Sequence, residues 1–254
     1  MATLDDSVEA FRAAYRRDEV GPRYTGWGHF TLTTATSLAA VAFAASRVHD
    51  VRPVEWLAVP VTFFIANAGE YLGHRGPMHH PRRGLRLLYG RHTLQHHRFF
   101  TNESMPCDSS RDFKMVLFPP VMLAFFLGVV APPIGLVLFL VAGANVAWLY
   151  VATVMAYFIT YEWLHLAYHA RDDSLVARLP LLSTLRRHHT LHHDPRLMHK
   201  HNFNITFPIC DRLFGTNHAG EEEEESAPPR AAAGGREGDP NARGVRPSAP
   251  REHE

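Results

Sequence analysis

The chain has 254 residues, and its formal net charge of +1 gives no overall attraction to nucleic acid. Its mean hydropathy of −0.15 averages very apolar stretches with a strongly polar C-terminal part, so each stretch is interpreted separately. The two cysteines, Cys107 and Cys210, lack CxxC spacing, which argues against a disulfide framework or a thiolate metal site and favours a reducing, cytosol-facing location.

The first 28 residues form a polar N-terminal arm. This arm is acidic first and amphipathic afterwards, and it lacks the basic start and short apolar core of a secretory signal. We therefore expect residues 1–28 to be a cytosolic arm of the mature protein.

Four apolar stretches follow, each long enough to cross a bilayer as a helix. They cover about residues 29–46, 54–73, 113–130 and 134–160. The short connection at residues 131–133 contains two prolines and predicts a helical hairpin turn. Core helices of a soluble protein are the alternative, which four such stretches in one chain disfavour. The sequence thus predicts an all-α integral membrane protein with four transmembrane helices in two hairpins.

Lysines and arginines predict the orientation of these helices. Eight of them lie in residues 75–114, whereas the connection between the first two stretches has only Arg47 and Arg52. By the positive-inside rule, both termini and the central segment face the cytosol. The last stretch continues to His169, interrupted only by Gly143, which predicts a helix of about 50 Å that extends beyond the hydrocarbon layer.

The C-terminal part, residues 219–254, has almost no large apolar side chains, so we expect a disordered tail after a membrane domain at 29–218. Its run of glutamates from Glu221 to Glu225 could bind a cation or a basic partner, but a solvated tail is the simpler interpretation.

Most of the 18 histidines fall into four short clusters on the predicted cytosolic side. The clusters contain His74, His79 and His80; His92, His96 and His97; His165 and His169; and His188, His189, His192 and His193. Positions three or four apart share a helix face, so each cluster directs two or three imidazoles toward one point. About eight to ten imidazoles exceed the needs of one metal ion. The clusters predict a dinuclear metal site in a cytosolic helical cap.

Iron is favoured over zinc, because a closed zinc site needs only four ligands and usually includes cysteine or a carboxylate. Two carboxylates, Glu70 and Glu162, lie about one helical turn before His74 and His165. They either orient imidazole N–H groups or simply form a cap or an ion pair, and both interpretations stay open.

These clusters resemble the fatty acid hydroxylase superfamily, which includes the sterol desaturases. The family's HxxxxH, HxxHH, HxxxH and HxxHH motifs lie on the cytosolic side of four transmembrane helices, and the phrase HNFNITFPICDRLFGT at residues 201–216 is similar to the family's C-terminal signature. The resemblance covers about residues 70–216. It implies ten metal ligands: His74, His79, His92, His96, His97, His165, His169, His189, His192 and His193.

Two departures from the family motifs affect this ligand set. The second cluster reads HxxxHH, with His92 one residue earlier than in HxxHH. In the last cluster His188 competes with His189, and the more usual spacing favours His189. Three further histidines either support the ligands or lie at the membrane surface; they are His80, His199 and His201.

The resemblance implies that two iron ions use dioxygen and external electrons to hydroxylate a C–H bond of a fatty acyl, sphingoid or sterol lipid, with no catalytic residue beyond the ligands. The basic segment could meet a lipid phosphate or carboxylate, or simply the membrane surface, through Arg82, Arg83, Arg86, Arg91 and Arg98. The chain has neither a GxGxxG fingerprint nor an iron–sulfur run, so we expect a ferredoxin, or a b-type cytochrome with its reductase, as electron donor.

Three alternative functions remain at this point. A lipid desaturase of the same family differs only in removing a second hydrogen. A membrane haem protein for electron transfer would need facing histidine pairs rather than triplets. A metal transporter would place its ligands inside the spans. Composition and the lack of an ER-retrieval signal favour the bacterial inner membrane over the endoplasmic reticulum.

Overall fold

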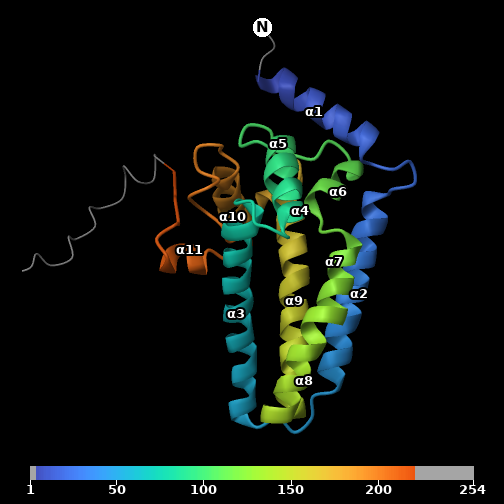
Figure 1. The fold of residues 1–254 in the computed structure, drawn as a ribbon, viewed down its shortest axis with the longest axis vertical. Helices are drawn as coiled ribbons and strands as arrows, with labels where there is room; N and C mark the ends of the chain where they lie inside the picture. Colours follow the sequence, from blue (N-terminus) through green and yellow to red (C-terminus); the bar gives the residue numbers. More distant parts are fainter. Residues whose placement is uncertain (1–3, 221–254) are drawn as a thin grey trace, which may run out of the picture. The chain divides into compact units, whose positions relative to one another are not determined.

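The computed structural model describes residues 4–220 (Figure 1). Residues 221–254, which carry most of the predicted disordered tail, lie outside the described residues. Within 4–220 the chain is helical, and an isolated bridge between Thr101 and Ser104 is its only β feature. The helices are α1 (Leu4–Asp18), α2 (Gly26–Ser46), η1 (Pro53–Leu57), α3 (Ala58–Gly73), η2 (His74–Met78), α4 (Arg86–Tyr89), η3 (Gly90–His96), α5 (His97–Phe99), η4 (Ser110–Asp112), α6 (Phe113–Val116), α7 (Pro120–Phe125), η5 (Phe126–Val130), α8 (Ala131–Ala142), α9 (Ala144–Tyr168), η6 (Val176–Arg178), α10 (Pro180–His192) and α11 (Ile209–Leu213).

The long helices α2, α3, α8 and α9 lie side by side, and α9 packs against the other three (Figure 1). Two helices among the described residues are long and apolar enough to cross a membrane, Pro120–Ala142 and Ala144–Tyr168. The first of these is α7, η5 and α8 joined into one continuous helix. The all-α prediction is thus confirmed. Four transmembrane helices were predicted, and the described residues contain two that meet the criteria of length and composition.

The hairpin turn predicted at residues 131–133 is wrong. The helix continues through Pro132 and Pro133, which lie in the first turn of α8 directly after the π-helical turn η5. Such a local π adjustment can accommodate the backbone groups that prolines leave unpaired. The chain reverses instead at Gly143, whose φ of 97° and ψ of 172° are accessible almost only to glycine.

The predicted helix of about 50 Å is wrong for the same reason. Because the chain reverses at Gly143, the last long helix begins at Ala144 and has 25 residues. At 1.5 Å per residue it is about 38 Å long.

Short helices form a cap over one end of the long helices. This is the end at which both α3 and α9 finish. The cap includes α4, α5, α6 and α10, and α1 lies against it (Figure 1). The buried face of α1 carries Val8, Arg12 and Tyr15, the spacing of an amphipathic helix. Tyr15 packs there in an apolar cluster with Phe99 and Phe100 of the cap.

Candidate metal centre

The first two histidine clusters lie on π-helical segments rather than on regular α-helix. η2 contains His74 and ends before His79, and η3 contains His92 and ends before His97. Residues five apart are neighbours in a π-helix, because its hydrogen bonds join residues i and i+5. The imidazole rings accordingly lie 4.9 Å apart for His74 and His79, and 4.7 Å apart for His92 and His97.

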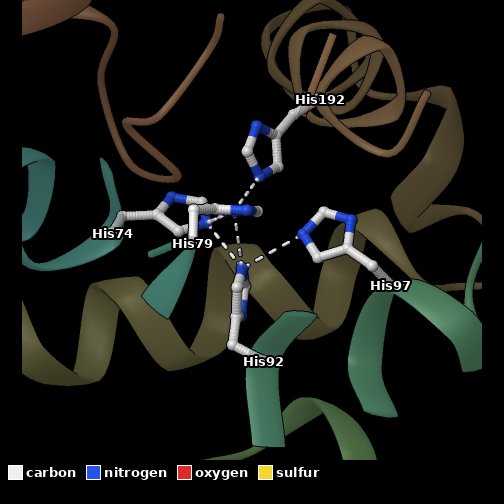
Figure 2. A group of neighbouring side chains, drawn as sticks. All are labelled: His74, His79, His92, His97 and His192. Atoms are coloured by element: carbon white, nitrogen blue, oxygen red, sulfur yellow. Dashed lines mark hydrogen bonds between the residues drawn. The ribbon is translucent and has the colours of Figure 1, made fainter. Parts of the chain in front are cut away.

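The clusters assemble into two buried groups whose ligand atoms lie within 4.8 Å of one another. The first group is His74, His79, His92, His97 and His192, and the second is His96, His165, His169 and His189. In Figure 2 the five side chains of the first group point toward one another from separate segments of the cap. The two groups adjoin, since the rings of His92 and His96 stack 5.2 Å apart.

The tenth predicted ligand, His193, lies between the two groups. Its Nε2 is 3.1 Å from Nε2 of His189, and its ring stacks 4.3 Å from that of His97. The structure therefore brings all ten predicted residues together.

Backbone carbonyls orient many of these imidazoles. Nδ1 of His192 lies 2.9 Å from the carbonyl oxygen of His201 and that of His74 lies against the carbonyl of Phe203. Similar contacts join His96 to Met115, His169 to Met105 and His193 to Phe100. A carbonyl can only accept, so Nδ1 carries the proton and Nε2 presents its lone pair to the interior of the group.

The Nε2 atoms lie closer together than expected for neutral imidazoles that carry their proton on Nδ1. Nε2 of His92 lies 2.7 Å from that of His74 and 3.1 Å from those of His79 and His97. One ring nitrogen has a single proton or a single lone pair, so it cannot satisfy three such contacts. Converging lone pairs are what a metal ion requires, and the residues therefore fit a bound metal in each group.

Burial keeps these histidines neutral. Loss of hydration lowers the pKa of His74 to about 4 and that of His193 to about 3. It also lowers the pKa of His92 well below its usual value, with nearby histidines adding to the effect. The imidazoles are thus in the ligating form at neutral pH.

Consecutive histidines divide between the two groups, so the prediction that each cluster points to one place is wrong for two clusters. His96 belongs to the second group and His97 to the first, because successive residues of a helix point about 100° apart. His189 belongs to the second group and His192 to the first, although these two residues lie about one helical turn apart. His188 belongs to neither, and its Nε2 lies 3.3 Å from the carboxylate of Asp211.

The two carboxylates near the ligands bind N–H and hydroxyl groups rather than imidazoles. Glu70 accepts from the backbone N–H groups of Ile205 and Thr206 and from the hydroxyl of Tyr157. Glu162 accepts from the N–H of Phe118 at 3.2 Å. The interpretation that these carboxylates orient imidazole N–H groups is therefore wrong for both Glu70 and Glu162.

The three further candidate histidines, His80, His199 and His201, lie around the first group. Nδ1 of the exposed His80 is 2.8 Å from the carbonyl oxygen of Arg75. The ring of His199 is 5.4 Å from the buried ring of His79. His201 acts through its carbonyl, which binds His192.

Asp211 is an important residue that the sequence interpretation missed. Its fully buried carboxylate accepts from the N–H groups of Phe203 and Asn204 at 2.9 and 2.7 Å and from the hydroxyl of Thr216 at 2.7 Å. These bonds hold the segment whose Phe203 carbonyl orients His74. The signal was available, because Asp211 lies within the C-terminal signature at residues 201–216.

An apolar cavity of about 340 Å³ reaches the first group from between the long helices. α3, α7, η5 and α9 contribute most of its wall, and Glu70, His74, Tyr157 and Tyr161 are its polar or ionisable lining residues. A small cavity of about 100 Å³ shares Met78, Phe118 and Tyr161 with it and is also lined by His96 and His165. The apolar space therefore adjoins both groups.

Two helices long and apolar enough to cross a membrane, an apolar cavity and two buried histidine groups able to hold metal ions are together the features of a membrane metalloenzyme. The profile of the fatty acid hydroxylase family matches residues 59–216, more than half of the chain and all ten histidines. The chain belongs to this family and is an oxidoreductase with histidine metal sites. Comparison with curated proteins and with solved structures finds no match.

Proposed function

We propose that this protein is a membrane di-iron oxygenase that hydroxylates a C–H bond of a lipid with dioxygen and external electrons. The observation that carries this proposal is the pair of adjoining histidine groups beside an apolar cavity. Two bound iron ions would supply the activation of dioxygen, which no amino-acid side chain can provide.

The ten histidines would hold the metals, and their surroundings would fix them in place. Groups of four and five neutral imidazoles suit two ions rather than one. Carbonyls such as that of Phe203 prevent the rings from turning, and the burial of the histidines would keep water away from a bound substrate. Haem iron takes one or two axial protein ligands, so groups of four and five converging imidazoles disfavour the haem alternative.

A lipid chain is the substrate that the cavity favours. Its wall is mostly apolar and contains no lysine or arginine. A second apolar cavity of about 440 Å³ shares Ala66, Val130 and Val154 with it and continues away from the histidines between α3, α8 and α9. An aliphatic chain lying in this space would present one carbon to the metal centre, while a charged head group would stay outside.

We also propose that four helical stretches cross the membrane, with residues 29–218 as the membrane domain. The 21 residues of α2 reach the usual length of about 20, as do the 16 residues of α3 with the five of η1. Large apolar side chains on these helices are exposed, for example Phe43 at 59% and Ile65 at 66%. Lipid contact would cover such a surface.

The histidine cap would face the cytosol. Arg82, Arg83 and Arg86 are exposed in the cap, whereas the connection at the other end of α2 and α3 carries only Arg47 and Arg52. The positive-inside rule then orients the protein, in our proposal in the bacterial inner membrane. A cytosolic ferredoxin or b-type cytochrome with its reductase would supply the electrons.

Elemental analysis of detergent-purified protein tests this function. We expect one iron for each histidine group, loss of one in His192→Ala or in His96→Ala, and loss of both in the double variant. The exposed His80 provides the control, and His80→Ala should keep both irons. With ¹⁸O₂, a reductase system and membrane lipids, mass spectrometry should find ¹⁸O in a lipid alcohol. An alkene without ¹⁸O would indicate the desaturase, and no metal above background would refute the proposal.

A further inference from the structure

The N-terminal helix α1 lies outside the part of the chain that matches the family, yet it contacts the histidine cap through a buried arginine. Arg12 is only 2% exposed. Its Nε donates to the carbonyl of Phe99 at 2.8 Å, and its Nη2 donates to the carbonyl of Ser104 at 2.7 Å. Nη1 lies 3.3 Å from the carboxylate of Asp108. One side chain thus holds both ends of the segment from Phe99 to Ser104.

Each of these two carbonyls directly precedes a carbonyl that orients a histidine. The carbonyl of Phe100, next to Phe99, accepts from Nδ1 of His193 at 2.7 Å. The carbonyl of Met105, next to Ser104, accepts from Nδ1 of His169 at 2.8 Å. The positions of the two orienting carbonyls therefore depend on the backbone that Arg12 holds.

Further contacts make this attachment rigid. The guanidinium of Arg12 lies 5.1 Å from the ring centre of Phe99 and 5.4 Å from that of Phe100. One helical turn later, Arg16 forms two bonds with the buried carboxylate of Asp112, at 2.8 and 2.9 Å. A planar guanidinium with donors in a fixed fork can hold two carbonyls at once, which a lysine ammonium cannot do in the same geometry.

We propose that Arg12 is a positioning residue for the second histidine group, acting through the segment from Phe99 to Met105. His169 belongs to this group, and Nε2 of His193 lies 3.1 Å from that of His189, another member. The inference rests on the proposed metal centre. It is selective, because the carbonyls that orient His74 and His192 belong to Phe203 and His201, which Arg12 does not contact. Loss of Arg12 should therefore weaken metal binding by the second group and leave the first group intact.

Titration of the metal-free full-length protein with Co²⁺ tests this selectivity, because the visible absorption of Co²⁺ reports its ligands. Second-sphere partners of metal-binding histidines typically contribute 10–100-fold to affinity. Arg12 acts one step further from the metal, through the segment that carries the orienting carbonyls, so we expect Arg12→Ala to weaken one of two Co²⁺ sites about 10-fold, the lower end of this range. The absorption band of that site should change, while the other site stays as in the wild type. Arg12→Lys should recover part of the affinity and is the variant to use should Arg12→Ala fail to fold.

Two controls separate positioning from general loss of packing. Val8→Ala removes a buried side chain from the same face of α1 and should leave both Co²⁺ sites unchanged. Arg17→Ala removes an exposed arginine whose partner is the neighbouring Asp18, and it too should have no effect. Unchanged Co²⁺ binding in both Arg12 variants would overturn the inference, as would equal weakening of both sites. Failure of the wild type to bind Co²⁺ would instead refute the metal centre itself.

Discussion

Replacement of Asp211 should weaken the first histidine group, the counterpart of the effect expected for Arg12 on the second. In Asp211→Asn, an amide NH₂ replaces one of the carboxylate oxygens that now accept from Phe203 and Asn204. A buried N–H that loses its acceptor costs about 1–3 kcal/mol. Asp211→Ala removes both acceptors and should destabilise the protein by about 2–6 kcal/mol.

The effect should extend from stability to metal binding. Displacement of Phe203 moves the carbonyl that orients His74, so affinity at the first group should fall about 10–100-fold. Denaturant unfolding and Co²⁺ titration of the same preparations measure the two effects. Glu55→Gln is the matched control, because Glu55 is another buried carboxylate that accepts from a backbone N–H, that of Arg52. Normal affinity at the first group in a destabilised Asp211→Asn would refute the proposed link from Asp211 to His74.

Three further outcomes are expected. Metal-free protein should lose stability as the pH falls from about 6.5 toward 4, because the unfolded chain then binds protons that native His74, with a pKa of about 4, does not; equal denaturant midpoints at pH 7.5 and 5.5 would contradict this. Ala66→Phe should shift product formation toward shorter lipid chains, since Ala66 lines both large cavities, and an unchanged chain-length profile would argue against their joint use. Gly143→Ala should lower the free energy of unfolding by about 1–3 kcal/mol because of its φ of 97°, and a smaller change would show that the turn adapts.

The histidine clusters, together with the family resemblance, predicted which residues meet, because both the clusters and the motifs are visible in the sequence. Spacing also indicates i+4 pairs such as His165 and His169, which do share the second group. It did not reveal which group His96 and His97 each join, since that depends on where π-helical turns end and how the segments pack. Such details are set by tertiary contacts that a local pattern does not contain.

The groups that orient the ligands were beyond sequence interpretation for a different reason. Every residue has a carbonyl, so nothing in the sequence distinguishes those of Phe100 and Phe203. The contact between Arg12 and Phe99 joins positions 87 residues apart, and an arginine on an amphipathic helix normally lies at the surface. For the hairpin, two prolines were a stronger local signal than one glycine, yet the π-helical turn before them kept the helix intact.

Helix α9 fixes the distances along its axis between the histidines and the side chains that line the cavity. The same helix carries His165, with His169 directly after its last residue, and closer to its beginning it carries cavity-lining side chains such as Phe158 and Val154. Each residue advances by 1.5 Å, so Phe158 lies about 10 Å and Val154 about 16 Å along the axis from His165. A bulky side chain introduced at one turn or the next would stop a lipid chain at a different depth. Graded substitutions along α9 would thereby choose which carbon is brought to the histidines.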